Sequence, residues 1–248
     1  MTFCYDKFAK LKEFTDNVGG IYGTEDLAVY LYSIVKMSKP KHVLELGTGF
    51  GTTSLWMALA LQENGCGILH TVDDGSEWDS LKQAKNAFGE YYNDIYYNYI
   101  CNLIKSFDLK DEVRFHYSKV EELNYCDEYD IIFSDFSHGP FFITKLIADC
   151  LHKMSDDSYI FIDSASTYYP SFQTLNSIID GLNAGRIPRT LQELIHPNNL
   201  SAFKEKVSNS RFELTHLIEK KDRDQNSTAQ IRIIPYDIMP QPRVNIRF

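Results

Sequence analysis

The stretch His42-Val-Leu-Glu-Leu-Gly-Thr-Gly-Phe-Gly51, followed by Thr52-Thr-Ser-Leu-Trp-Met-Ala58, decides the fold of this chain. A short apolar run, three alternating glycines and an apolar helical pattern are typical of a strand that turns directly into a helix. The glycines allow positive φ and leave no Cβ between the backbone and a ligand. The free N–H groups of the following helix favour a carboxylate or phosphate, so the turn predicts a binding site. An ordinary strand–turn–helix corner is the alternative.

The spacing of the glycines argues against a dinucleotide site. A dinucleotide loop has the pattern G-x-G-x-x-G, whereas here the third glycine comes one position early and Thr52 takes its place. Glu45 lies two residues before the first glycine. A carboxylate there suits a cationic ligand better than a pyrophosphate. The loop therefore favours a cationic ligand over a dinucleotide.

Composition excludes several classes of protein. The 248 residues are 44% hydrophobic, which is ordinary for a globular chain, and neither a linker nor a repeat divides them, so we expect one domain covering residues 1–248. The net charge of −9 disfavours a nucleic-acid partner, because phosphate contacts need clustered Lys and Arg. No apolar run approaches the ~18 residues that span a bilayer, and the first residues lack a signal-peptide core. We therefore expect no membrane partner.

The cysteines indicate a reducing compartment. They are scattered, with no C-x-x-C pair, which predicts reduced thiols in a cytoplasmic protein and no zinc site. The five are Cys4, Cys66, Cys101, Cys126 and Cys150.

Four predicted strands each end in an acid. The strands cover residues 42–46, 67–73, 129–135 and 158–163, and a fifth without such an acid covers 113–117. In an open parallel sheet, ligands bind outside the carboxyl ends of the strands. Asp73 also follows the glycine loop by about twenty residues, the spacing at which an acid accepts the ribose hydroxyls of a nucleoside. The four acids are Glu45, Asp73, Asp135 and Asp163.

The remaining segments complete an α/β plan. Residues 4–17 and 24–37 predict helices, separated by Gly19-Gly20 and with Thr24 as the N-cap of the second. Residues 141–154 predict an amphipathic helix, and 165–210 a helical cap over the site. Residues 212–218 and 229–234 predict a hairpin that completes the sheet. A Tyr-rich insertion at about 79–100 could line a substrate pocket, form the interface of a homodimer, or be extra core.

The pattern E-x-G-x-G-x-G resembles motif I of the class I S-adenosylmethionine-dependent methyltransferases. Over most of residues 24–236 the order of elements is similar too, and nicotinamide Rossmann domains lack the final hairpin. The resemblance implies a Rossmann-like α/β fold: a mostly parallel seven-stranded sheet with a C-terminal antiparallel hairpin and helices on both faces. The run Leu103–Phe115 before the third strand is similar to small-molecule O-methyltransferases of the catechol and caffeoyl-CoA type.

This resemblance implies S-adenosylmethionine as cofactor and a small molecule as methyl acceptor, at oxygen or nitrogen. The glycine loop and Thr53 would hold the methionine part, Asp73 the ribose, and residues 118–121 the adenine. The residues implied to bind the cofactor are Glu45, Gly47, Thr48, Gly49, Gly51, Thr53, Asp73, Ser118, Lys119, Val120, Glu121 and Asp135.

The same resemblance implies a divalent cation and a general base. Metal-dependent members use an acid after strand four, which matches Asp135, and an Asp-Asn pair after strand five, which here is Asp163-Ser164. Mg²⁺ commonly keeps several waters, so one could replace the missing Asn. The lysine base of those enzymes corresponds to His138. A histidine side chain in general can exchange a proton near neutral pH, so it could accept one from the nucleophile. The alternative is that His138 only begins the turn at Gly139-Pro140.

Three other functions remain open at this stage. A methyltransferase of RNA or protein would use the same cofactor, although the acidic composition counts against it. An aminopropyl- or similar transferase can use the same fold. A catalytically silent cofactor-binding scaffold would bind the cofactor without turnover.

Overall fold

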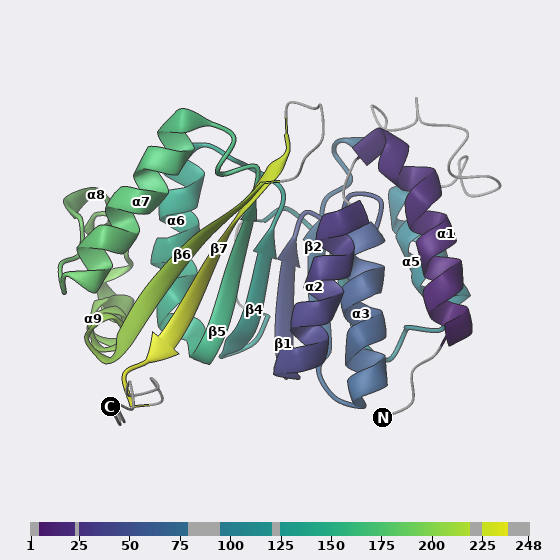
Figure 1. The fold of residues 1–248 in the computed structure, drawn as a ribbon, viewed down its shortest axis with the longest axis horizontal. Coiled ribbons are helices and arrows are strands. Elements are labelled where there is room, and N and C mark those ends of the chain that lie inside the picture. The colour runs from purple at the N-terminus through teal and green to yellow at the C-terminus, as the bar shows by residue number, and fades with distance from the viewer. Residues whose placement is uncertain (1–4, 23–24, 79–94, 121–124, 219–224, 238–248) are drawn as a thin grey trace, which may run out of the picture.

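A twisted sheet lies between two layers of helices in the computed structural model, which describes residues 5–22, 25–78, 95–120, 125–218 and 225–237 (Figure 1). The described strands follow the order β3-β2-β1-β4-β5-β7-β6. β7 is antiparallel to both of its neighbours, and the other paired strands are parallel. The predicted seven-stranded, mostly parallel sheet with a C-terminal hairpin is thus confirmed. The strands are β1 (His42–Leu46), β2 (Ile68–Asp73), β3 (Val113–Tyr117), β4 (Tyr129–Ser134), β5 (Met154–Asp163), β6 (Ser210–Ile218) and β7 (Ser227–Pro235).

The helices divide between the two faces of the sheet. One core contains residues of α1, α2, α3 and α5, and the other contains residues of α6, α7, α8 and α9. The helices are α1 (Tyr5–Tyr22), α2 (Glu25–Ser38), α3 (Thr52–Asn64), α5 (Tyr96–Ser106), α6 (Pro140–Cys150), α7 (Tyr169–Asn183), α8 (Arg189–Gln192) and α9 (Leu200–Asn209), with 3₁₀ turns η3 (Leu151–Lys153) and η4 (Pro197–Asn199).

The central strands are apolar because both of their faces are covered. In β4, Ile131 and Phe133 lie in the first core and Ile132 in the second, and all three are fully buried. Successive side chains of a strand alternate between faces, so a strand buried on both sides has a continuous apolar run. With both faces covered, the ends of the strands are where a ligand can approach.

Two predicted boundaries were wrong. The sequence predicted that the first helix ends at residue 17, but α1 continues through Gly19-Gly20 as far as Tyr22. Glycine lowers the stability of a helix but does not always end it. β5 begins at Met154, whereas the sequence predicted a helix as far as that residue and a strand from Ser158. The pairing of β5 with β4 shifts register near its start, and Asp157 has a positive φ of 53°. This irregularity exposes polar residues inside the strand, so the sequence there lacks the alternation of apolar and polar residues that is typical of a strand. Thr24, the predicted N-cap, lies outside the described residues.

The segment predicted as a cap over the site is instead part of the helical layer. α7 packs against α6 and β6, and its residues Leu175, Ile178 and Leu182 are buried in the second core. Figure 1 shows α7, α8 and α9 on the far side of the sheet from α1. Only the start of this segment reaches the strand ends, where the ring of Tyr168 stacks on His138. The apolar face of α7 explains the difference, because it has to be buried against the sheet.

The Tyr-rich segment is described only from Ile95 onward. Tyr96 and Tyr99 on α5 are buried in the first core, whereas Tyr97 is exposed. Of the three roles considered for this segment, a place in the hydrophobic core is therefore correct for Tyr96 and Tyr99. Residues 79–94 lie outside the described ranges. Nowhere in those ranges does a helix combine the length and the apolar character that crossing a bilayer requires.

Candidate active site

The glycine loop lies close against the carboxyl end of β4. Gly47, Gly49 and Gly51 all have positive φ, at 92°, 53° and 80°. A Cβ on Gly47 would lie 2.5 Å from the carbonyl oxygen of Asp135, closer than two such atoms can approach. Glycine is therefore required at position 47 for two reasons, the backbone conformation and the contact.

Glu45 lies beneath this loop, not in a cavity. Its side chain is fully buried and accepts hydrogen bonds from the hydroxyls of Thr53, Ser54 and Thr71, the last at 2.6 Å. The sequence predicted that Glu45 and Thr53 contact the cofactor. In the structure both side chains are buried and bond to each other, so they support the loop instead. The reason is strand alternation: residue 45 faces α3, and its carboxylate joins that helix to β1 and β2.

Burial raises the pKa of the Glu45 carboxyl to about 7, although the three hydroxyl donors favour its charged form. Between the ordinary pKa and this raised value the folded chain binds more protons than the unfolded chain, so stability falls as pH rises. We expect the wild type to lose about 2.5 kcal/mol between pH 5 and pH 8 relative to Glu45→Gln, which cannot titrate. Denaturant unfolding of both proteins at the two pH values measures this. A constant difference would contradict it.

Asp73 fastens the glycine loop to the end of β2. Its Oδ2 accepts the backbone N–H groups of Thr48 and Gly49, each at 3.0 Å, and its Oδ1 accepts that of Gly75 at 2.7 Å. A carboxylate has about four acceptor positions, and here three amides and the nearby phenol of Tyr96 share them. The carboxylate of Asp73 is therefore held in place beside the loop, and its contact with a ribose stays a prediction.

A cavity of about 680 Å³ joins the glycine loop to the ends of β2 and β4. A volume of this size is typical of small-molecule sites. Of the predicted residues it contains Gly47, Gly49, Asp73, Lys119, Val120, Asp135 and His138. Gly51, Thr48 and Ser118 are not part of its lining, and Glu121 lies outside the described residues. Lining residues that sequence reasoning did not single out are Val72, Asp74, Gly75, Ser76, Glu77, Trp78, Tyr96, Phe136 and Gln225.

Tyr96 connects α5 to the glycine loop. Its hydroxyl donates to the carbonyl oxygen of Gly49 at 2.8 Å. Burial, and next the charge of Asp73, raise the pKa of this phenol far above its ordinary value, so it remains a neutral donor. The tyrosine-rich composition was the only sign of this residue in the sequence, and it did not distinguish Tyr96 from its neighbours.

We expect Tyr96→Phe to weaken binding of S-adenosylhomocysteine about threefold to tenfold, because the loop carbonyl loses the donor that fixes it, worth about 1 kcal/mol. Tyr99→Phe is the matched control. Its hydroxyl donates to the carbonyl of Phe50 at 3.0 Å, but Tyr99 does not line the cavity. Both variants should lose similar stability, and only Tyr96→Phe should lose affinity, as measured by calorimetry. Equal affinities would exclude a role for Tyr96 in binding.

Asp135, His138 and Asp163 meet at the other end of the cavity. One ligand atom from each lies within 4.8 Å of the others. His138 donates from Nδ1 to the backbone carbonyl of Asp163 at 2.9 Å, and the ring of Tyr168 stacks on it with 6.2 Å between centroids. With the proton on Nδ1, Nε2 keeps its lone pair and can accept a proton or bind a metal. The three side chains thus lie together, and their catalytic and metal-binding roles stay predictions.

Ser164 cannot replace the Asn of metal-dependent relatives. It is fully buried, and its hydroxyl donates to Oδ2 of Asp163 at 2.7 Å, while Thr228 donates to Oδ1 at 3.1 Å. The donor set that remains consists of two carboxylates and one imidazole. Mg²⁺ prefers oxygen ligands, whereas imidazole suits transition metals, so these residues fit a cation such as Mn²⁺ or Fe²⁺ better than Mg²⁺.

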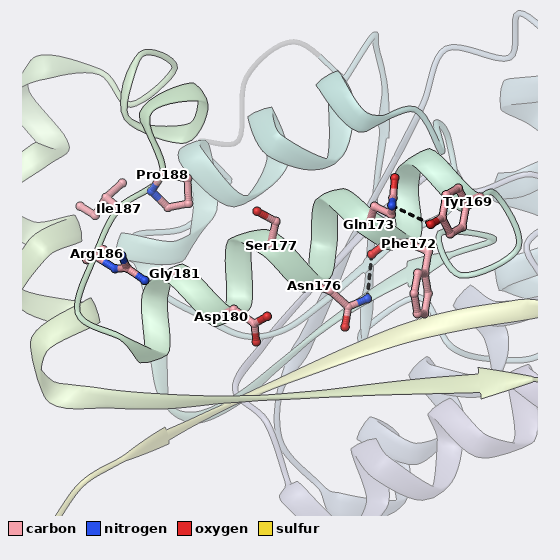
Figure 2. A pocket seen from close by; sticks show the side chains of 10 residues that line it. All are labelled: Tyr169, Phe172, Gln173, Asn176, Ser177, Asp180, Gly181, Arg186, Ile187 and Pro188. Carbon is pink, nitrogen blue, oxygen red and sulfur yellow. Dashed lines mark hydrogen bonds between the residues drawn. The ribbon is translucent and has the colours of Figure 1, made fainter.

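A second groove, of about 790 Å³, runs along α7 and shares no lining residue with the cavity at the glycine loop (Figure 2). Its charged side chains are one acid, Asp180, and one base, Arg186. Two of the polar side chains drawn in it bond to protein groups: Asn176 to the carbonyl of Phe172 and to His216 on β6, and Gln173 to Tyr169. The cavity at the glycine loop is therefore the better candidate for an active site.

Known proteins resemble the chain in sequence and in fold. Residues 44–165 match a family described as a methyltransferase domain. Two putative O-methyltransferases of Mycobacterium leprae are 33% identical to it over 82 residues, which are 33% of this chain and 35% of each relative. The match thus spans about a third of the length of those relatives.

Solved structures show the same fold over nearly the whole chain. A putative O-methyltransferase from Klebsiella pneumoniae superposes with a TM-score of 0.55 at 15% identity, covering 92% of this chain and 90% of that one. The O-methyltransferase from Bacillus cereus, in complex with SAH, superposes with 0.53 at 13% identity, covering 91% and 90%. Residues 44–165, just under half of the chain, therefore match the methyltransferase-domain family, and the chain shares its fold with these solved O-methyltransferases.

Proposed function

We propose that this protein transfers a methyl group from S-adenosylmethionine to an oxygen, or alternatively a nitrogen, of a small molecule. One observation carries the proposal: a single cavity is lined by the glycine loop, by Asp73 at the end of β2 and by Asp135 and His138 after β4. A methyl donor and a proton acceptor then face the same space. The family match of residues 44–165 supports this assignment.

The cofactor would lie along the cavity from β2 to β4. Asp73 would accept a ribose hydroxyl, Lys119 and Val120 would flank the adenine, and the glycine loop would lie beside the methionine part. SAH is bound in the O-methyltransferase of Bacillus cereus and in a Podospora anserina methyltransferase of similar fold, and SAM in the O-methyltransferase TomG of Streptomyces achromogenes.

His138 would act as the general base. Its Nε2 would accept the proton of the acceptor hydroxyl as the oxygen attacks. Bound S-adenosylmethionine would supply the methyl group, so that a C–O bond would form, the C–S bond would break and neutral S-adenosylhomocysteine would leave. Most of the rate enhancement would come from holding the oxygen and the methyl carbon in near-attack geometry. The carbonyl of Asp163 and the ring of Tyr168 hold the imidazole in the orientation this requires.

A bound divalent cation is a second role for the same cluster. Asp135, His138 and Asp163 would be its ligands, and the cation would lower the pKa of the acceptor hydroxyl. The Nε2 lone pair cannot serve as ligand and base at once, so the two roles exclude each other. If turnover continues in EDTA, His138 acts as the base. If EDTA abolishes turnover and added Mn²⁺, but not buffer alone, restores it, His138 is a metal ligand.

The acceptor is proposed to be small because the cavity must hold it beside the cofactor. The net charge of −9 counts against RNA. A cytoplasmic location belongs to this proposal and is supported by the described cysteines, Cys66, Cys101, Cys126 and Cys150, which are all free thiols. A homodimer also remains a prediction, which size-exclusion chromatography with light scattering would test.

Thermal unfolding with S-adenosylhomocysteine tests the cofactor assignment. At a ligand concentration about 100 times Kd, linkage gives about 2.7 kcal/mol, or roughly 5–10 °C in Tm for a domain of this size. NAD⁺ is the control and should give no shift. A shift with NAD⁺ alone, or with neither ligand, would overturn the proposal. Release of S-adenosylhomocysteine in a screen of small phenols, alcohols and amines then separates an enzyme from a silent scaffold.

A further inference from the structure

A second group of metal-binding side chains lies away from the glycine loop. His42 begins β1, His70 lies within β2, and Cys126 comes three residues before β4. One ligand atom from each lies within 4.8 Å of the others, and all three residues are half-buried. None of them lines the cavity at the glycine loop. The group is therefore separate from the candidate active site.

His42 has a buried ring nitrogen that nothing in the described structure satisfies. Its Nδ1 is inaccessible to solvent and has no hydrogen-bond partner there. The backbone at this point is fixed, because Oδ2 of Asp130 accepts the N–H groups of Lys41 at 2.7 Å and His42 at 2.9 Å. Buried polar atoms normally have a partner, and one without a partner calls for an explanation, such as a bound ion.

His70 is held in a form that can bind a metal. Its Nδ1 lies 2.9 Å from Nε2 of His116, and the two rings stack with 5.2 Å between centroids. In the tautomer that donates this proton to His116, Nε2 of His70 keeps its lone pair. A second imidazole that orients the first is a usual feature of metal sites.

Cys126 contributes a thiol and lies beside an opening to solvent. Its backbone N–H donates to the hydroxyl of Tyr129 at 3.4 Å. A bound metal ion would remove the proton of this thiol. A cavity of about 640 Å³ contains both His42 and Cys126 together with the acids Asp127, Glu128 and Asp130. It provides an entry path and oxygen atoms or water for a fourth position.

We propose that His42, His70 and Cys126 bind a zinc ion. Two imidazole nitrogens and one thiolate form a borderline-soft donor set that suits Zn²⁺ and not Mg²⁺ or Ca²⁺. Tetrahedral zinc needs ligand atoms about 3.3–3.6 Å apart, so atoms spread over as much as 4.8 Å would close by about 1 Å through side-chain rotation. The bound ion would join β1, β2 and the segment before β4. The sequence predicted no zinc site, because these ligands are far apart along the chain and follow no short motif.

Cobalt titration of the metal-free protein tests the site. Co²⁺ bound by a thiolate gives an intense charge-transfer band in the near ultraviolet. The cluster of Asp135, His138 and Asp163 contains no sulfur and cannot produce this band. We expect one equivalent of Co²⁺ to produce it in the wild type and in Cys101→Ser, which replaces another half-buried free thiol. Cys126→Ser should lack it. The same band in Cys126→Ser, or no band in the wild type, would overturn the proposal.

Zinc-dependent stability provides an independent measurement. With free Zn²⁺ at about 100 times Kd, Tm should rise by roughly 5–10 °C, and Mg²⁺ should produce no such rise. His42→Gln keeps the thiol and should weaken zinc binding at least tenfold, so it remains informative if Cys126→Ser folds poorly. Unchanged affinity in a folded His42→Gln variant excludes the site. Neither measurement depends on methyltransferase activity, so the failure of one proposal is distinguishable from the failure of the other.

Discussion

Replacing His138 by alanine is expected to slow methyl transfer roughly 100-fold or more, because removing a positioned general base costs about 10²–10⁴-fold. Binding of S-adenosylhomocysteine should change little. The imidazole follows β4, which β1 separates from Asp73 at the end of β2, and its Nδ1 donates to a backbone carbonyl. Single-turnover kinetics at saturating cofactor measures the chemical step, and the thermal shift with S-adenosylhomocysteine measures affinity.

Two controls make this result specific to His138. His196→Ala replaces a histidine whose side chain accepts a hydrogen bond from its own turn at Asn198 and lies outside the cavity, so its turnover should be normal. Added imidazole should partly restore turnover to His138→Ala if the missing group is a base. Turnover within a few-fold of wild type in His138→Ala would remove this residue from the mechanism and leave it as the start of the turn into α6.

The fold was predictable because its signals are local and agree with one another. The loop from Gly47 to Gly51 fixes one strand-to-helix connection, and the apolar runs fix the buried strands. Asp73, Asp135 and Asp163 were predicted at one edge because parallel strands all end on the same side. The structure places two of them in one cavity and the third beside His138. This part of the site follows from topology alone.

Other parts depended on side-chain direction and on packing, which a sequence does not state. Glu45 belongs to the motif but faces α3, because the alternation of β1 places it on the helical side. The helix α7 was predicted as a cap, but its apolar face is buried against the sheet. Tyr96 reaches the glycine loop only because α5 packs beside it. These contacts arise from tertiary packing, and no local pattern encodes them.

The separation of His42, His70 and Cys126 along the chain shows the same limit. A zinc site is predictable from sequence when its ligands share a short motif. Here each ligand comes from a different element, and only the pairing of β1 with β2 brings the two histidines together. The glycine loop, by contrast, needs no partner strand to be recognised, so its importance can be tested directly by substitution.

Gly47→Ala is expected to lower the free energy of unfolding by about 3 kcal/mol or more and to weaken binding of S-adenosylhomocysteine at least tenfold. A left-handed backbone costs a residue with a Cβ roughly 1–2 kcal/mol. The new methyl would also lie 2.5 Å from the carbonyl oxygen of Asp135, so the loop must move away from β4. That movement would displace the amides of Thr48 and Gly49 from Asp73, and with them the predicted cofactor contacts.

Gly65→Ala separates the two contributions. Gly65 also has a positive φ, of 70°, but nothing lies within 4 Å of its added Cβ. It ends α3 on the side away from the loop, so its alanine variant should lose only about 1 kcal/mol and keep full affinity. Urea unfolding and calorimetric titration of both variants measure the difference. Both variants place an alanine at a positive φ, so any larger loss of unfolding free energy in Gly47→Ala measures the contact with the end of β4. If the two variants behave alike, the close approach of the loop to Asp135 has no energetic consequence, and the glycine at position 47 serves only its turn.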